Sequence, residues 1–232
     1  MPKFDAMNKI ILTADGSNTL FNENIGEHYH STHGALQESK HVFIDAGLRH
    51  TIALFPDGEF SIFEVGFGTG LNFLLTLAHC KENGVGLRYT GVEAFPITKE
   101  ELQQTGYEKY VPEEIWAALV DNYTAAIDGE LELFPGIWLS ILKDKLEDVQ
   151  PSGSHHLIYY DAFSVRHQPE LWSDEVIGHA AGFLMPGGVF ATYAITGKLK
   201  RALKAVGFTI EKLPGAAGKR EMLRATKNKP VQ

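Results

Sequence analysis

The sequence predicts an α/β fold in which a mostly parallel sheet of seven strands carries helices on both faces and ends in an antiparallel hairpin. Three observations support this prediction. Strand-like and helix-like patterns alternate from residue 61 onward, which is typical of a parallel sheet with covering helices. A glycine-rich turn joins the first strand pattern to the first helix pattern. The last two strand patterns follow one another across a Pro/Gly-rich turn with no helix between them.

The predicted elements cover the chain from residue 61 to its end. Strands are expected at 61–65, 88–92, 137–142, 155–160, 188–194, 207–213 and 221–226. Helices are expected at 70–82, 97–104, 112–127, 169–183 and 197–206. Met185-Pro-Gly-Gly188 predicts a sharp turn into the fifth strand, and Gly207 is a candidate C-cap for the last helix. Residues 61–232 therefore form the predicted main domain.

Residues 1–60 do not follow the alternation, and we expect them to form an extension that packs on the main domain. Ile10–Thr13 and Thr19–Phe21 flank a short polar turn and predict a β-hairpin. A helical pattern follows and runs to about Asp45.

Three histidines, His28, His30 and His33, lie within six residues of this extension. We interpret them as part of a polar loop at the mouth of a site rather than a metal centre. No cysteine or carboxylate partner shows the spacing of metal ligands.

Composition restricts the classes of protein that fit. The chain has 232 residues, of which 44% are hydrophobic, so it can build a large globular core. No apolar run approaches the roughly 18 residues of a membrane span, and the N-terminus lacks an apolar signal region. Cys80 is the single cysteine, which excludes an internal disulfide and favours a buried position in the first helix. We expect a cytoplasmic protein with no membrane partner.

Charge is distributed unevenly along the chain. Residues 198–232 hold ten Lys/Arg against two acidic residues, a net charge of +8, so residues 1–197 carry −16 of the total of −8. A basic segment on an acidic body favours a polyanion such as nucleic acid as a partner. A solvated C-terminal face is the alternative.

The glycine-rich turn is the most informative motif. The first predicted strand continues into Glu64-Val-Gly66-Phe-Gly68-Thr-Gly70-Leu-Asn72. A dinucleotide fingerprint needs its third glycine three positions after the second, where this chain has Leu71. The pattern resembles instead the first motif of class I methyltransferases that use S-adenosylmethionine. That resemblance implies a Rossmann-like domain, with the acid, the glycines and the asparagine as cofactor-binding residues. The alternative is a tight turn without a ligand.

Acidic residues follow the next two predicted strands. Glu93 ends the second strand, where an acidic side chain accepts hydrogen bonds from ribose hydroxyls in doubly wound folds. Asp144 follows the third strand, and its carboxylate could meet an adenine amino group. Either one, taken alone, could be an ordinary loop acid.

The fourth predicted strand ends in Asp161-Ala-Phe163-Ser164, at the same edge of the sheet as the glycines. This loop resembles the Asp/Asn-Pro-Pro-Tyr/Phe loop of amino-group methyltransferases, although it lacks both prolines. It predicts that Asp161 orients an amine beside the cofactor and that Phe163 packs on a planar substrate. Alternatively, Asp161 caps the next segment and Phe163 belongs to the core.

The whole chain then resembles one family, the methyltransferase domains of the bacterial tRNA 5-methylaminomethyl-2-thiouridine biosynthesis (MnmC) proteins. The resemblance is carried by Gly34-Ala-Leu-Gln-Glu-Ser39, Val65-Gly-Phe-Gly-Thr-Gly-Leu-Asn-Phe73, Glu93-Ala-Phe-Pro-Ile97, Tyr160-Asp-Ala-Phe-Ser164, Gly188-Val-Phe-Ala-Thr-Tyr193 and Gly218-Lys-Arg-Glu-Met-Leu223. Because no second dinucleotide motif follows, we expect a stand-alone methyltransferase without the flavin-dependent oxidase of two-domain members. An upstream enzyme would then supply its substrate.

The resemblance implies methyl transfer from S-adenosylmethionine to the amine of 5-aminomethyl(-2-thio)uridine at the tRNA wobble position. Tyr193 is expected to line the substrate pocket. Lys198, Lys200, Arg201, Lys219 and Arg220 are expected to bind phosphates of the anticodon stem-loop, although Lys219 and Arg220 could instead pair with Glu221 or cap the hairpin.

An aspartate with a pKa near 4 is a poor base, so we expect Asp161 to position the amine more than to deprotonate it. Two other readings stay open. One is a methyltransferase acting on a small-molecule or protein amine. The other is a non-catalytic ligand sensor or nicotinamide-binding protein.

Overall fold

The structure, a computed structural model, describes residues 8–56, 58–216 and 218–230. Its main sheet consists of β4 (Phe60–Val65), β5 (Leu87–Val92), β6 (Leu131–Phe134), β7 (Ile137–Leu142), β8 (His155–Tyr160), β9 (Leu184–Thr192), β10 (Phe208–Pro214) and β11 (Glu221–Lys227). The strand order is β10-β11-β9-β8-β4-β5-β7-β6. The five strands from β7 to β9 in this order are parallel, and β10 and β11 form the predicted antiparallel hairpin. The α/β fold and the seven predicted strands are confirmed.

Two parts of the sheet differ from the prediction. The eighth strand, β6, pairs antiparallel with β7 at the edge of the sheet. Its four residues made too short a pattern to predict, and the Glu132 side chain closes the turn by accepting a hydrogen bond from the Gly136 N–H at 2.8 Å. β9 begins at Leu184 and keeps Pro186 inside the strand, because the register with β8 shifts there. Proline lacks an N–H, so it is tolerated at such a bulge.

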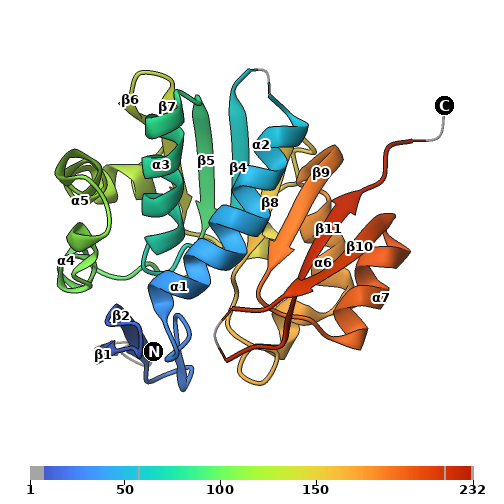
Figure 1. Cartoon of the computed structure of the whole chain (residues 1–232), viewed down its shortest axis with the longest axis horizontal. Helices are drawn as coiled ribbons and strands as arrows, with labels where there is room; N and C mark the ends of the chain where they lie inside the picture. The colour runs from blue at the N-terminus through green and yellow to red at the C-terminus, as the bar shows by residue number, and fades with distance from the viewer. Residues whose placement is uncertain (1–7, 57, 217, 231–232) are drawn as a thin grey trace.

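The helices form a layer on each face of the sheet. They are α1 (Ala35–Ser39), the π-helical η1 (Lys40–Arg49), α2 (His50–Leu54), α3 (Leu71–Asn83), α4 (Lys99–Gln104), α5 (Glu113–Asp128), α6 (Asp174–Ala181) and α7 (Gly197–Ala205), with the 3₁₀ turns η2 (Tyr107–Lys109), η3 (Leu146–Asp148) and η4 (Pro169–Trp172). In Figure 1, α3 and the continuous rod α1–η1–α2 lie in front of the sheet, and α6 lies behind it.

Two helices have other bounds than expected. The N-terminal helix continues beyond Asp45 to Leu54 and packs on the sheet. It approaches closely at Gly47, where an added Cβ would lie 3.2 Å from the Tyr159 ring. The predicted helix at 169–183 is divided into η4 and α6, because Ser173 has extended backbone and its hydroxyl caps α6 by accepting from the Val176 N–H.

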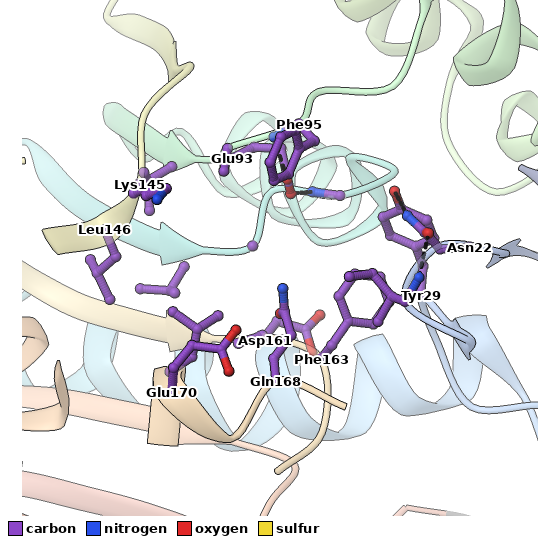
Figure 2. A pocket seen from close by; sticks show the side chains of 18 of the residues that line it. Asn22, Tyr29, Glu93, Phe95, Lys145, Leu146, Asp161, Phe163, Gln168 and Glu170 are labelled. Carbon is purple, nitrogen blue, oxygen red and sulfur yellow. Dashed lines mark hydrogen bonds between the residues drawn. The ribbon is translucent and has the colours of Figure 1, made fainter. Parts of the chain in front are cut away.

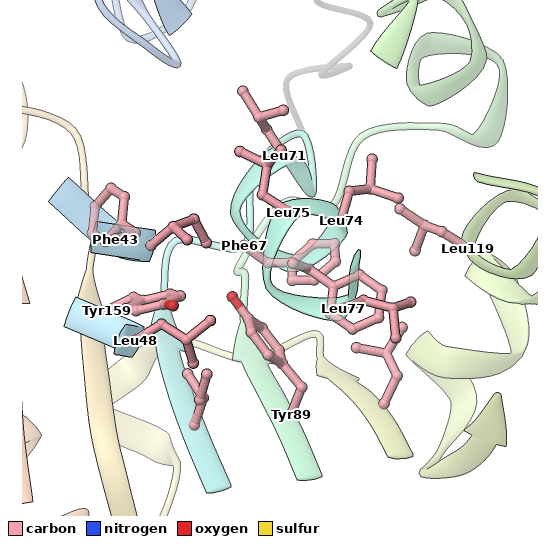
Figure 3. Close-up of a cluster of buried hydrophobic side chains, with 14 of the residues drawn as sticks. Phe43, Leu48, Phe67, Leu71, Leu74, Leu75, Leu77, Tyr89, Leu119 and Tyr159 are labelled. Atoms are coloured by element: carbon pink, nitrogen blue, oxygen red, sulfur yellow. The ribbon is translucent and has the colours of Figure 1, made fainter. Parts of the chain in front are cut away.

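Alternation along the strands divides the core into two clusters. On β8, Leu157 and Tyr159 join the cluster under α3 and η1, whereas Ile158 and Tyr160 join the cluster under α6 and α7. Successive strand residues point to opposite faces, which explains this division. Figure 3 shows the first cluster, where Phe43 and Leu48 of η1 lie near the Tyr159 ring and leucines of α3 lie above Tyr89. Cys80 of α3 is buried in this cluster, as expected.

The N-terminal extension places its hairpin at the edge of the sheet where the parallel strands end (Figure 1). β1 (Lys9–Leu12), β2 (Asn18–Asn22) and β3 (Glu27–His28) form a small antiparallel sheet, and the β1–β2 pair confirms the predicted hairpin. Residues 1–7 of the expected extension lie outside the described residues. Within the described part of the chain, no helix combines the length and apolarity that crossing a bilayer requires.

Candidate active site

A pocket lies at the carboxyl ends of the parallel strands (Figure 2). Its lining includes Gly66 and Gly68 from the turn after β4, Glu93 after β5, and Asp161 and Phe163 after β8. These strands are neighbours in the sheet, so residues about 30 and 70 positions apart along the chain meet in one place. Open α/β sheets bind their ligands at this edge.

The turn after β4 has the geometry of a backbone cradle. Gly66 and Gly68 have φ of +82° and +53°, values that side-chain-bearing residues rarely adopt. A Cβ on Gly66 would lie 2.7 Å from the Asp161 carbonyl oxygen, and a Cβ on Gly68 would lie 3.0 Å from the Tyr29 ring. Gly70, with φ of +73°, is the N-cap of α3 and packs against Leu119 and Phe67 rather than lining the pocket.

Glu93 is tied to this cradle. Its two carboxylate oxygens accept hydrogen bonds from the N–H groups of Gly68 and Phe95, both at 3.1 Å. Burial raises the pKa of the carboxyl, and these two backbone bonds oppose the rise. Figure 2 shows Glu93 and Phe95 together at one wall of the pocket, opposite Asp161.

Asp144 does not join this pocket. It is exposed, and the lining residues of its loop are Lys145, Leu146 and Glu147. The chain turns into η3 directly after this position, which carries the next side chains to the pocket instead. The loop expected from the sequence therefore reaches the pocket, but the Asp144 side chain itself is exposed to solvent.

Glu64 lies beneath the cradle rather than in the pocket. It is fully buried, accepts a hydrogen bond from the Asn72 amide at 2.9 Å and another from the Tyr89 hydroxyl at 2.8 Å. Burial raises the pKa of this carboxyl well above its ordinary value. The same Asn72 amide donates to Asp161 Oδ2 at 2.8 Å. Glu64 and Asn72 thus act as a buried support that connects the first motif to the loop after β8.

Asp161 has an altered proton affinity. Burial raises the pKa of its carboxyl to about 7, the negative charge of Glu38 adds to the rise, and the Asn72 hydrogen bond and Lys219 oppose it. The expectation of an ordinary pKa near 4 was wrong, because the sequence does not show how deeply the strand end is buried. A carboxylate with a pKa near 7 can accept a proton at neutral pH.

A second cavity, of about 270 Å³, lies on the other side of the Asp161 loop. Its walls include Glu27, Tyr29 and Glu38 from the N-terminal extension, and Phe163 and Tyr193 from the main domain. The rings of Tyr29 and Phe163 meet edge to face with centroids 5.0 Å apart, and both residues also line the first pocket. Figure 2 shows these two rings pointing toward one another. The two cavities therefore share an aromatic wall.

The N-terminal extension makes hydrogen bonds to the loop after β8 and to the glycine turn after β4. Glu27 Oε2 accepts a hydrogen bond from the Ser164 N–H at 2.8 Å. His30 is buried and hydrogen-bonds through Nε2 to the Thr69 hydroxyl of the glycine turn at 2.9 Å. The expected polar loop with three histidines thus contributes to the mouth of the site. Within the described residues, no three His, Cys, Asp or Glu side chains gather as a metal ion would need.

The basic residues expected to bind phosphates fall into two groups. Lys198 and Arg201 of α7 are exposed, and Lys200 between them is half-buried. Arg220 is exposed beside a third, open cavity that Arg166 also lines. Lys219 lines both this third cavity and the second cavity, and its ammonium pairs with Glu38 and lies 3.8 Å from the centre of the Tyr193 ring. Its partner is thus Glu38 rather than the Glu221 considered from sequence.

Sequence reasoning missed Tyr29, Glu38 and Arg166 as members of the site. Glu38 lies in one of the strings that carried the family resemblance, which was the available signal. Tyr29 adjoined the histidines without a motif of its own, and Arg166 lies outside the basic C-terminal segment.

The lining residues fit S-adenosyl-L-methionine. The two cradle glycines leave room that any Cβ would fill, so a ligand can approach the backbone. Glu93, at the end of β5, would accept hydrogen bonds from the ribose hydroxyls. Asp161 would hold the ammonium of the methionine part through its carboxylate, and the apolar groups of Phe95, Leu146 and Val92 suit a purine ring.

Comparisons with known proteins agree with this geometry. Residues 103–228 match the family described as S-adenosyl-L-methionine-dependent methyltransferase. The bifunctional tRNA 5-methylaminomethyl-2-thiouridine biosynthesis protein MnmC of Leptospira borgpetersenii is 31% identical over 211 residues, covering 84% of this chain and 31% of that protein. The MnmC protein of Magnetococcus marinus is 34% identical over 215 residues, covering 88% and 32%. The chain spans about a third of the length of these relatives.

Solved structures show the same fold. The crystal structure of MNMC2 from Aquifex aeolicus superimposes with a TM-score of 0.77 at 24% identity, covering 99% of this chain and 73% of that one. Spermidine synthase from Thermotoga maritima gives a TM-score of 0.52 at 12% identity, covering 97% and 71%. The resemblance to the MnmC proteins is confirmed, the cofactor is S-adenosyl-L-methionine, and the chain belongs to the S-adenosyl-L-methionine-dependent methyltransferase family.

Proposed function

We propose that the protein methylates the exocyclic amine of 5-aminomethyl(-2-thio)uridine at the wobble position of tRNA. The observation that carries the proposal is the position of Asp161, whose loop separates the cofactor pocket from a second cavity with aromatic and acidic walls. An amine on a planar base needs both a carboxylate and a ring to pack on. The names of the MnmC relatives, which refer to tRNA 5-methylaminomethyl-2-thiouridine biosynthesis, support the same substrate.

The mechanism follows from the proton affinity of Asp161. An alkylamine has a pKa near 10, as lysine does, so at neutral pH it arrives as an ammonium. The Asp161 carboxylate attracts this ammonium, and with a pKa of about 7 it can accept one proton and leave the amine with its lone pair. When bound, S-adenosylmethionine supplies a methyl group on a positively charged sulfur, which an uncharged amine can attack.

The surrounding residues align the amine and exclude water. Phe163 and Tyr29 form the shared wall at the junction of the two cavities, and stacking of a base on such a ring contributes about 1–3 kcal/mol. The Tyr193 hydroxyl donates to the Ala162 carbonyl at 2.9 Å, which fixes the loop between the cavities. Holding both reactants in line can lower the barrier by roughly 7–11 kcal/mol.

The exposed cations suit an RNA backbone. Arg166 and Arg220 line the open cavity next to the second one, and Lys198 and Arg201 lie on α7. The wobble base belongs to a single-stranded loop, so little pairing energy opposes its entry into the cavity. We infer that these four residues contact phosphates of the anticodon stem-loop, and that the aminomethyl group comes from an upstream enzyme.

The test uses methyl-labelled S-adenosylmethionine and two tRNA preparations, one with 5-aminomethyluridine and one with unmodified uridine at the wobble position. After digestion, label is expected in 5-methylaminomethyluridine from the first preparation only. Label in both preparations, or transfer to small alkylamines but to neither tRNA, would overturn the wobble-base assignment. The second result would favour a small-molecule methyltransferase.

A further inference from the structure

Lys219 occupies an unusual position for a residue of the basic C-terminal segment. Its side chain is about one third exposed, and its ammonium pairs with Glu38, whose side chain is 6% exposed. Glu38 is itself fixed by the Ser31 N–H, which donates to its other carboxylate oxygen at 3.1 Å. The ammonium also lies over the face of Tyr193, 3.8 Å from the ring centre, and a ring face attracts a cation. Two contacts of its own, with Glu38 and with the Tyr193 ring, thus hold this lysine at the second cavity.

An ammonium has three N–H donors. Within the described residues, the hydrogen bond to Glu38 Oε2 accounts for one of them. Lys219, Glu38, Phe163 and Tyr193 line the same cavity, so the remaining donors are available to a molecule that enters it. A positive charge at this point repels an ammonium and favours an acceptor such as a carbonyl oxygen.

We propose that Lys219 is a specificity-determining residue that donates a hydrogen bond to the carbonyl group next to the aminomethyl substituent of the acceptor base. The inference rests on the proposed function. Two points of opposite charge would then orient the base, with its amine toward Asp161 and its carbonyl toward Lys219. Lys219 therefore recognises the base edge rather than a phosphate.

The chemistry of the pyrimidines makes the proposal specific. Uracil carries an acceptor, O4, beside C5, whereas cytosine carries an amino donor at the same place. Lys219 can donate to the first and not to the second. A site that binds a substrate group through a buried hydrogen bond discriminates strongly against an analogue without that group. The protein should thus prefer 5-aminomethyluridine to 5-aminomethylcytidine.

The experiment measures kcat/KM on two anticodon stem-loop RNAs that carry 5-aminomethyluridine or 5-aminomethylcytidine at the wobble position. For the unaltered protein we expect a ratio of roughly 10 to 100 in favour of uridine. Lys219→Met should bring this ratio close to one, and Lys219→Arg should keep most of it. Arg220→Met is the matched control, because Arg220 is the exposed cation next to Lys219 in the sequence. This variant should lower kcat/KM on both RNAs together and leave their ratio unchanged.

Salt dependence separates base recognition from phosphate binding. Loss of a phosphate contact reduces the slope of log(kcat/KM) against log[salt], so we expect a smaller slope for Arg220→Met and an unchanged slope for Lys219→Met. A Lys219→Met protein that keeps the uridine preference and loses salt dependence would overturn the proposal. Failure of the unaltered protein to methylate either RNA would overturn the proposed function instead.

Folding is checked by the affinity for S-adenosylmethionine, which Lys219→Met should retain because Lys219 does not line the cofactor pocket. If that variant does not bind the cofactor, the same two RNAs are compared with the Glu38→Gln variant instead. It removes the charge that anchors Lys219 and should lower the uridine preference several-fold. An unchanged ratio in Glu38→Gln would also contradict the proposal.

Discussion

The cofactor pocket and the second cavity differ in how the chain builds them. The pocket is formed mainly by loops that follow β4, β5, β7 and β8, each at the end of a predicted strand. The cavity joins residues 27–32 and Glu38 of the N-terminal extension to Phe163, Tyr193 and Lys219. Local sequence patterns therefore locate the first, whereas only the folded arrangement reveals the second.

The two regions meet at a narrow boundary. Tyr29, Ala162 and Phe163 line both, and the adjacent Asp161 faces the cofactor pocket. This arrangement predicts separable effects. Changes to the glycine cradle should abolish cofactor binding and all activity, whereas changes at Asp161 and on the cavity side should affect transfer and substrate choice more than cofactor binding.

Gly66→Ala should give the largest effect. An added Cβ would lie 2.7 Å from the Asp161 carbonyl oxygen at φ of +82°, so the cradle must shift and S-adenosylmethionine binding should weaken at least about 100-fold, the loss expected when about 3 kcal/mol of binding energy is removed. Gly84→Ala is the control, because it has φ of +65° and open space around its Cβ. It should cost about 1 kcal/mol of stability and leave calorimetric cofactor affinity intact. Equal affinities in both variants would contradict the cradle.

The pH dependence of kcat should report the protonation of Asp161, at the boundary between the two regions. A base must be deprotonated to act, and the pKa of Asp161 is raised to about 7 by burial and by Glu38. With bound substrate, kcat should rise about tenfold per pH unit below pH 7 and level off above it. Glu38→Gln removes a charge that raises the pKa of Asp161, so the rising part of the pH profile should move to lower pH. A limb near pH 4 in the unaltered protein would contradict the role of Asp161 as base.

Salt should produce a smaller effect, on RNA only. Lys198→Glu with Arg201→Glu should lower kcat/KM on tRNA several-fold at about 0.1 M salt, because each lost phosphate contact reduces the salt slope by about one. Cofactor affinity should not change, since both residues are exposed on α7 away from the pocket. Lys99→Glu with Lys109→Glu, near α4, is a matched charge reversal that should have little effect.

Stability should change least. The folded-state pKa of Asp161 lies above its ordinary value of 3.8, so the unfolded chain releases this proton first. The cost of the buried charge is absent below about pH 4 and complete above about pH 7. Asp161→Asn should therefore raise the melting temperature by a few degrees at pH 8 and have little effect at pH 4. A gain confined to low pH would contradict the assigned shift.

Sequence reasoning reached the fold because its main signals were local. Strand patterns that end in glycines or acids placed Gly66, Gly68, Glu93 and Asp161 at one edge, and the structure brings these four residues together. Asp144 and Glu64 show the limit. The direction of a side chain depends on a one-residue step along a strand or on the next turn, and neither is visible in the motif.

The rest of the site depends on tertiary contacts. Tyr29 reaches Phe163 across more than 130 residues, and Glu38 pairs with Lys219 across about 180. No periodicity connects such positions. The raised pKa of Asp161 likewise follows from burial at the junction of two cavities. The sequence does not show this burial, so it predicts an ordinary pKa.

The most direct test of the separation between the two regions is a paired measurement on Asp161→Asn, with S-adenosylmethionine affinity and the single-turnover rate of transfer to aminomethyluridine RNA determined on one preparation. The arrangement predicts a rate lower by about 10²–10⁴ and a much smaller loss of affinity, about tenfold, because only one charge-assisted contact to the cofactor is lost and the cradle glycines remain. An unchanged rate, or a loss of affinity as large as the loss of rate, would contradict it.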